Sequence, residues 1–209
     1  MLWAISSVSA LIYWALTLRA GHSWGRSAVK GMALLPLVTL ALWQDAPLVA
    51  LALALCSLGD VILSRPGEGA FLAGLVAFAL GHLGWIVVFA NRPGLEAHRL
   101  DDPLTIVLLA GLAVLILVVA RRILPRAGAL RLPVSVYMAI IAAMSVTAFA
   151  TGVALIITGA VLFTLSDALL GLQTFALTAG TRAERLANVL IWPLYWCAIV
   201  LLTLGALPV

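Results

Sequence analysis

Apolar residues run along this chain in long stretches, separated by short junctions rich in turn-forming residues. Four junctions are plain in the sequence: Gln44-Asp45-Ala46-Pro47, Arg65-Pro66-Gly67, Asn91-Arg92-Pro93-Gly94 and Pro125-Arg126-Ala127-Gly128. A helix rises about 1.5 Å per residue, so a bilayer core of about 30 Å needs about 20 apolar residues. The pattern predicts eight transmembrane helices, which we place at residues 2–19, 29–43, 47–64, 70–90, 103–124, 132–150, 153–173 and 188–206.

Two of these spans have unusual features. The second is short and contains Pro36, which a membrane helix tolerates where a neighbouring group satisfies the freed carbonyl. The first resembles a signal peptide, but it lacks a basic start and an obvious small-residue cleavage site. We therefore interpret residues 2–19 as the first helix.

The composition agrees with a chain that lies almost wholly in the membrane. Of its 209 residues, 65% are hydrophobic and 10% are charged, and the mean hydropathy is +1.20. A soluble domain carries about 25% charged residues because it needs a wetted surface. The sequence therefore predicts an all-α polytopic membrane protein, with residues 1–209 forming a single eight-helix transmembrane domain.

The basic residues are distributed unevenly between the two sides that eight alternating spans define. Ten of the twelve lie on one side, and the other side holds Arg92 and Arg99 beside several acids. This bias predicts that the richer side is cytoplasmic and that both termini are non-cytoplasmic, as in a bacterial inner membrane. The net charge of +4 then reflects the orientation of the chain in the membrane, and we expect no nucleic-acid partner. The ten residues are Arg19, Arg26, Lys30, Arg65, Arg121, Arg122, Arg126, Arg131, Arg182 and Arg185.

The cysteines and histidines do not have metal-ligand spacing. Cys56 and Cys197 lie within apolar spans, where a thiol usually packs as a small hydrophobe. His22 and His98 fall in connections, and His82 is the histidine that lies inside a span. We therefore expect no metal cofactor.

An internal similarity links the third and seventh predicted helices. The segment from Leu55 to Leu63 aligns with the segment from Leu162 to Leu170, and an aspartate occupies the same place in each. These helices run in the same direction, which suggests two parallel four-helix halves. The alternative is chance similarity between leucine-rich helices, which explains the shared aspartate poorly.

The two aspartates, Asp60 and Asp167, are the candidate functional residues. An aspartate in a membrane helix costs about 2.5 kcal/mol or more, so it is rare without a purpose. Both lie about 6–9 Å below the cytoplasmic boundary, and we expect them to face one another across one cavity that opens toward that side. The alternative is a polar cluster that fixes helix packing. Candidate supporting residues at or near this level are Lys30, Ser57, Tyr137, Ser166 and Tyr195, with His82 deeper.

The pattern around these acids resembles the YhhN/TMEM86 family of lysoplasmalogenase-like membrane proteins. The matching residues extend from about Lys30 to Tyr195. They comprise Ser57-Leu58-Gly59-Asp60, Phe71-x-x-Gly74-x-x-x-Phe78-x-x-x-His82-x-x-Trp85, Val136-Tyr137-Met138 with Met144, Gly159-Ala160-x-x-Phe163-x-x-Ser166-Asp167, and Pro193-x-Tyr195-Trp196.

The resemblance implies eight membrane helices and hydrolysis of the vinyl-ether bond of a lysoplasmalogen, which releases a fatty aldehyde and a glycerophospho-amine. It also implies that Asp60 and Asp167 are the catalytic pair. The chain departs from the family pattern in two places. Gly31 follows Lys30 where the family commonly has proline, and Ala198 and Ile199 lie where it tends to have a glutamine.

Two carboxyls suit this chemistry, since one proton shared between two acids provides both an acid and a base. A protonated carboxyl could protonate the outer alkene carbon, and an ionised one could stabilise the oxocarbenium ion and activate water. Two other classes stay open. One is a zinc-dependent membrane lipid hydrolase that uses both acids and His82, although one histidine is a poor ligand supply. The other is a small transporter or scaffold, in which the acids carry protons or pin helices.

Overall fold

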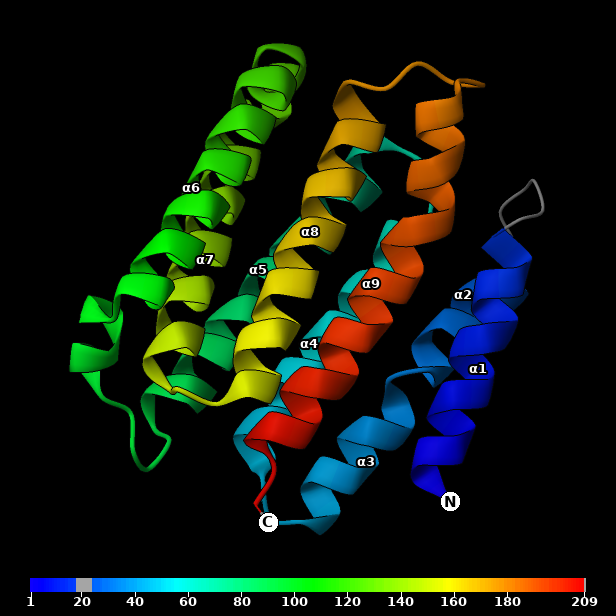
Figure 1. The fold of residues 1–209 in the computed structure, drawn as a ribbon. Helices are drawn as coiled ribbons and strands as arrows, with labels where there is room; N and C mark the ends of the chain where they lie inside the picture. The colour runs from blue at the N-terminus through cyan, green and yellow to red at the C-terminus, as the bar shows by residue number, and fades with distance from the viewer. Residues whose placement is uncertain (18–23, 209) are drawn as a thin grey trace. The chain divides into compact units, whose positions relative to one another are not determined.

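The computed structural model describes residues 1–17 and 24–208, and the regular elements within these ranges are all helical (Figure 1). Arg19, one of the ten basic residues assigned to the cytoplasmic side, lies outside the described residues. The α-helices are α1 (Leu2–Thr17), α2 (Trp24–Met32), α3 (Leu35–Trp43), α4 (Pro47–Leu63), α5 (Glu68–Ala90), α6 (Pro103–Ile123), α7 (Arg131–Ala150), α8 (Ala154–Phe175) and α9 (Arg182–Ala206). Short 3-10 helices are η1 (Ala97–Asp101), η2 (Leu124–Arg126) and η3 (Gly128–Leu130).

The helices occupy the predicted apolar stretches, and the all-helical class is confirmed. Within the described ranges, six helical segments are long and apolar enough to cross a membrane, while α1 and α4 are shorter apolar helices of 16 and 17 residues. The count of eight spans therefore stays a prediction. Two helices begin earlier than expected, α2 at Trp24 and α9 at Arg182, because their first turns are polar and hydropathy does not detect them.

The chain forms two compact units. Unit 1 comprises Met1–Val88 with Ala206–Val209, and unit 2 comprises Phe89–Gly205. Asp60 belongs to unit 1 and Asp167 to unit 2, so each acid is described below with the partners in its own unit.

The predicted second helix is divided at Ala33 and Leu34 into α2 and α3, and Pro36 explains the break. Proline has no N–H group and its ring crowds the carbonyl four residues earlier, so the helical hydrogen bonds are interrupted there. The Ser6 hydroxyl of α1 donates to the Ala33 carbonyl at 2.5 Å. A buried side chain on a neighbouring helix thus satisfies a carbonyl at the break, as the tolerance of a membrane proline requires.

Close approach at glycines joins α4 to α5 in unit 1. A Cβ placed on Gly74 would lie 2.5 Å from Leu63 Cδ1, and one on Gly84 would lie 3.2 Å from the Ala52 backbone. Small residues of this kind let membrane helices pack backbone to backbone. Since Gly74 meets the end of α4 and Gly84 meets its first half, the two helices are antiparallel.

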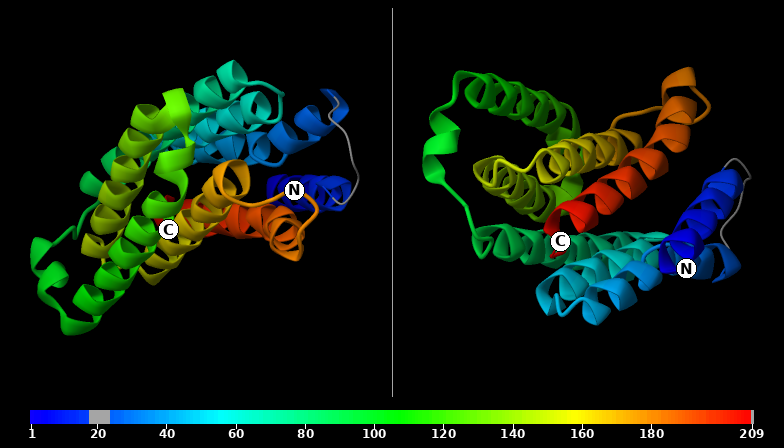
Figure 2. Two further views of the ribbon diagram at one scale, coloured as in Figure 1. Left: turned by 90° about the horizontal axis from the view of Figure 1, so that it is seen from above. Right: turned by 60° about the horizontal axis from the view of Figure 1, so that its bottom comes forward.

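Unit 2 is built on a similar antiparallel contact between α8 and α9. Gly159 near the start of α8 packs against Leu202 near the end of α9, while Gln173 near the end of α8 bonds Asn188 near the start of α9. At one end of the unit, η1 packs on α6 and α7 (Figure 2). These contacts position the polar residues of α7, α8 and α9 that the sequence singled out.

Candidate functional site

Asp60 forms an ion pair with Lys30 in unit 1. The Lys30 Nζ lies 2.8 Å from Asp60 Oδ1, and the Asp60 side chain is 1% exposed. The Lys30 side chain is 13% exposed, and its Nζ lies 5.6 Å from the centre of the Tyr13 ring. Both charges are therefore largely removed from solvent, and the lysine lies beside an aromatic face, which attracts a cation.

The ion pair belongs to an antiparallel contact between α2 and α4. One turn before Asp60, the Ser57 hydroxyl donates to the Gly31 carbonyl at 3.4 Å. Gly31, the residue after Lys30, lies in this contact, and a Cβ there would lie 3.2 Å from Val61 Cγ2. Gly31 thus occupies a close packing position at the site where the family pattern has proline.

Asp167 accepts a hydrogen bond from a tyrosine in unit 2. The Tyr137 hydroxyl donates to Asp167 Oδ2 at 2.6 Å, from the first half of α7 to the second half of α8. Tyr137 itself is buried, with an exposed fraction of 8%. A short bond to a buried phenol fixes one oxygen of this carboxyl, and therefore the orientation of the other.

The remaining predicted residues of unit 2 position α8 against α9. The Ser166 hydroxyl donates to the Ile191 carbonyl at 3.0 Å. Tyr195 packs edge to face on Phe163, with ring centres 5.2 Å apart, and also contacts Trp192. The Ser166 bond thus stabilises the packing of α8 on α9, and Tyr195 lies on the face of α9 that contacts α8.

Ala198 and Ile199, where the family tends to have glutamine, are also fully buried. The Ala198 carbonyl lies 3.1 Å from the position that a Cβ on Gly159 would take. The main chain at Ala198 thus lies in the close contact between α8 and α9.

His82 is fully buried in α5 and is bonded within its own helix. Its Nδ1 lies 2.7 Å from the Phe78 carbonyl, so that nitrogen carries the proton and donates. Its neighbour Gly81 packs against Cys56. The antiparallel register of α4 and α5 thus places His82 about one helical turn away from the level of Asp60.

The residues that the sequence predicted are therefore brought into two pairs, Lys30 with Asp60 and Tyr137 with Asp167. The predicted approach of Asp60 to Asp167 joins residues of different units and stays a prediction. Tyr13 was missed, because a tyrosine in an apolar stretch has no signal that separates it from a packing residue. Among the described residues, no group of three or more His, Cys, Asp or Glu side chains has an arrangement that could hold a metal ion.

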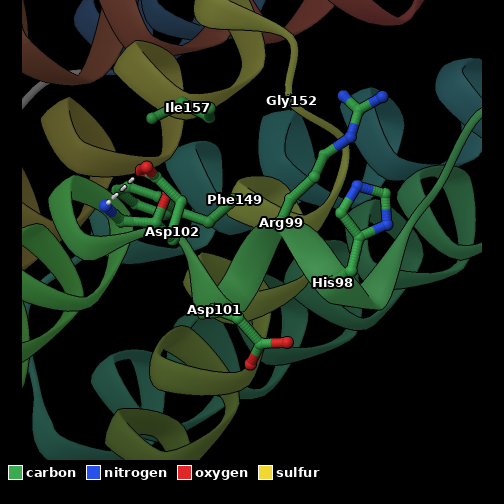
Figure 3. Close-up of a pocket in the computed structure, with 8 residues that line it drawn as sticks. His98, Arg99, Asp101, Asp102, Phe149, Gly152 and Ile157 are labelled. Carbon is green, nitrogen blue, oxygen red and sulfur yellow. Dashed lines mark hydrogen bonds between the residues drawn. The ribbon is translucent and has the colours of Figure 1, made fainter.

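A shallow pocket of about 570 Å³ lies at one end of unit 2, away from the Tyr137–Asp167 pair (Figure 3). Arg99 crosses it and donates to the Thr151 carbonyl at 2.8 Å. It passes over Gly152, which has a φ of +65° and where a Cβ would lie 1.6 Å from Arg99 Nη1. Arg99 also pairs with Glu96 at 3.1 Å. These contacts tie η1 to the connection between α7 and α8, which gives Arg99 a structural role.

Comparisons with known proteins bear on the whole chain. The model of the YhhN family matches residues 1–206. The human protein named lysoplasmalogenase TMEM86B is 31% identical over 209 residues, which cover 96% of this chain and 84% of that protein. No solved structure matches.

Proposed function

The chain belongs to the YhhN family, and we propose that it is a lysoplasmalogenase-like hydrolase that acts on a single-chain membrane lipid. The observation that carries the proposal is the 31% identity to a lysoplasmalogenase along 96% of the chain. The family and the apolar helices together make the chain an integral membrane protein. The proposed substrate is a lysophospholipid whose fatty chain is attached by a vinyl ether.

The proposed reaction consumes one water molecule. A proton is added to the outer alkene carbon, and the double-bond electrons form the new C–H bond and leave an oxocarbenium ion. Water then adds to the inner carbon and loses a proton. The resulting hemiacetal loses its hydroxyl proton as its bond to the glycerol oxygen breaks, and the glycerol oxygen takes up a proton. A fatty aldehyde and a glycerophospho-amine are released.

We assign the first proton transfer to Asp167. The Tyr137 hydroxyl donates to Oδ2, so that oxygen is engaged as an acceptor. A protonated Asp167 would then carry its proton on Oδ1 and present it in a direction that Tyr137 fixes. A positioned acid of this kind contributes about 10²–10⁴-fold to rate.

We assign the base and the stabilisation of the cation to Asp60. Its 2.8 Å ion pair with Lys30 suits a carboxylate, and so the negative charge is present before the substrate binds. A carboxylate in a site from which water is largely excluded stabilises a developing cation more strongly than it does in water. The joint action of the two acids is part of the proposal, and by analogy with glycosidases we expect their carboxyls to be about 5–10 Å apart.

We propose that the chain crosses the membrane eight times, with α1, the α2–α3 pair, α4, α5, α6, α7, α8 and α9 as the spans. Both termini would be non-cytoplasmic. Reporter fusions after residue 127 and at the C-terminus are then expected to report opposite sides of the membrane. The same side for both fusions would contradict the count.

The proposed mechanism needs no metal ion, and purified protein is expected to contain no stoichiometric zinc. Elemental analysis of the protein, prepared without chelator, measures this directly. One zinc per chain that disappears in Asp60→Ala would instead favour the zinc-hydrolase alternative. The experiment that tests the function itself is release of aldehyde from a lysoplasmalogen by the purified protein. A saturated ether lysophospholipid, which has no double bond to protonate, is the control.

A further inference from the structure

A second polar layer lies on the α2–α4 contact, one helical turn from the Lys30–Asp60 pair. The Ser27 hydroxyl is 2.6 Å from the Ser64 hydroxyl, and the Arg65 guanidinium donates to Ser27 Oγ. Ser27 precedes Lys30 by three residues and Ser64 follows Asp60 by four, spacings that put each pair on one face of its helix. We call Ser27, Ser64 and Arg65 the serine–arginine layer.

This layer extends from the interior to the surface of unit 1. Ser27 is 1% exposed, whereas Trp24, on which the Arg65 guanidinium stacks at 4.1 Å, is 73% exposed. Tryptophan is enriched at the level of lipid headgroups because its ring is amphipathic. Stacking on Trp24 and the bond to Ser27 hold the guanidinium in one orientation before any ligand arrives.

The donors of the layer match a phosphate group. A guanidinium offers five N–H donors in a planar fork that fits two phosphate oxygens at once, and such charge-assisted bonds are about twice as strong as neutral ones. The Ser64 hydroxyl donates to the Val61 carbonyl at 2.6 Å and the Ser27 hydroxyl bonds Ser64, so the serines hold Arg65 in place and the guanidinium supplies the donors for a phosphate. The chemistry of this layer is therefore that of a phosphate diester in a lipid headgroup or of free phosphate.

We propose that the serine–arginine layer binds the headgroup phosphate of the lysophospholipid substrate. The inference rests on the proposed function and adds a binding site to it. Four residues of helix separate Ser64 from Asp60, a rise of about 6 Å. The glycerol backbone that links the phosphate to the vinyl ether has to cover a similar distance. A phosphate held by Arg65 would thus place the ether near Asp60.

The test is direct binding of two lipids that the proposed reaction does not cleave. Full-length protein in maltoside micelles is titrated with a saturated ether lysophosphatidylethanolamine and with the matching alkylglycerol, which lacks the phosphate. The wild type is expected to bind the phospholipid about 10-fold to 100-fold more tightly. Arg65→Gln is expected to lose this preference, and Arg121→Gln, which removes an exposed arginine of α6, is expected to keep it.

Several results would overturn the inference. They are equal binding of the two lipids by the wild type, an unchanged preference in Arg65→Gln, or binding of inorganic phosphate as tight as that of the lysophospholipid. If Arg65→Gln does not fold, Arg65→Lys replaces it, because lysine keeps the charge but lacks the fork. That variant should weaken binding of the phospholipid and leave binding of the alkylglycerol unchanged, and an equal change in both would contradict the site.

Binding of these lipids does not depend on turnover, so the two proposals fail separately. A phosphate preference that requires Arg65, in a protein that releases no aldehyde, would overturn the enzymatic function and support the site. Aldehyde release with no phosphate preference would support the enzymatic function and overturn the phosphate site.

Discussion

Asp167→Asn and Asp60→Asn are each expected to lower the turnover of a lysoplasmalogen by about 100-fold or more, the scale of removing an acid–base group. An asparagine at 167 can still accept the bond from Tyr137 through its amide oxygen, but it has no proton of carboxyl acidity to transfer. An asparagine at 60 has no negative charge to stabilise a cation. The measurement is the rate of aldehyde release at saturating substrate.

The matched control is Asp101→Asn, which neutralises an exposed aspartate of η1. It is expected to leave turnover within about twofold of the wild type, since exposed substitutions away from a site usually have small effects. If one membrane aspartate can be replaced with no more loss than Asp101, that residue has a packing role.

Lys30→Met is expected to destabilise the protein by about 3–5 kcal/mol, because it leaves the buried Asp60 carboxylate without its cation. Adding Asp60→Asn to this variant should recover much of the loss, since the double variant contains neither charge. The free energies of unfolding follow from denaturation in mixed micelles, measured for both single variants and for the double variant. The coupling energy of the pair is the change in stability of the double variant minus the sum of the changes in the two single variants, each relative to the wild type.

Arg121→Met is the control for charge removal as such, because Arg121 is exposed on α6. A loss of stability in Lys30→Met that Asp60→Asn does not reduce would contradict the account of the ion pair. Asp60→Asn alone is expected to cost stability as well, through the lysine that it leaves behind. Asp167→Asn, whose partner is a neutral phenol, should cost less.

The sequence predicted the helices well because hydropathy responds to the same bilayer dimension that sets their length. Pro36 marked the break between α2 and α3, and Ser6, far away in the chain, supplies the bond that makes this break tolerable. The early starts at Trp24 and Arg182 were missed, since a polar first turn has no apolar signal.

The candidate acids could be predicted because a charged residue in an apolar stretch is conspicuous. Their partners depend on the register between helices, which no local pattern contains. Lys30 was expected near the level of Asp60 and forms an ion pair with it, whereas Arg65 and Ser27 were not singled out as a site. Arg65 was counted as an orientation charge, and its bond to Ser27 appears only when α2 lies antiparallel to α4.

We propose that this protein hydrolyses a vinyl ether by protonating carbon. The reaction of purified protein with a lysoplasmalogen in D₂O tests this step, with the aldehyde trapped at once as an oxime and analysed by mass spectrometry. We expect aldehyde that carries one deuterium on the carbon next to the carbonyl, and no such product from Asp167→Asn above the uncatalysed background. Absence of aldehyde from the wild type, or aldehyde without deuterium at that carbon, would contradict it.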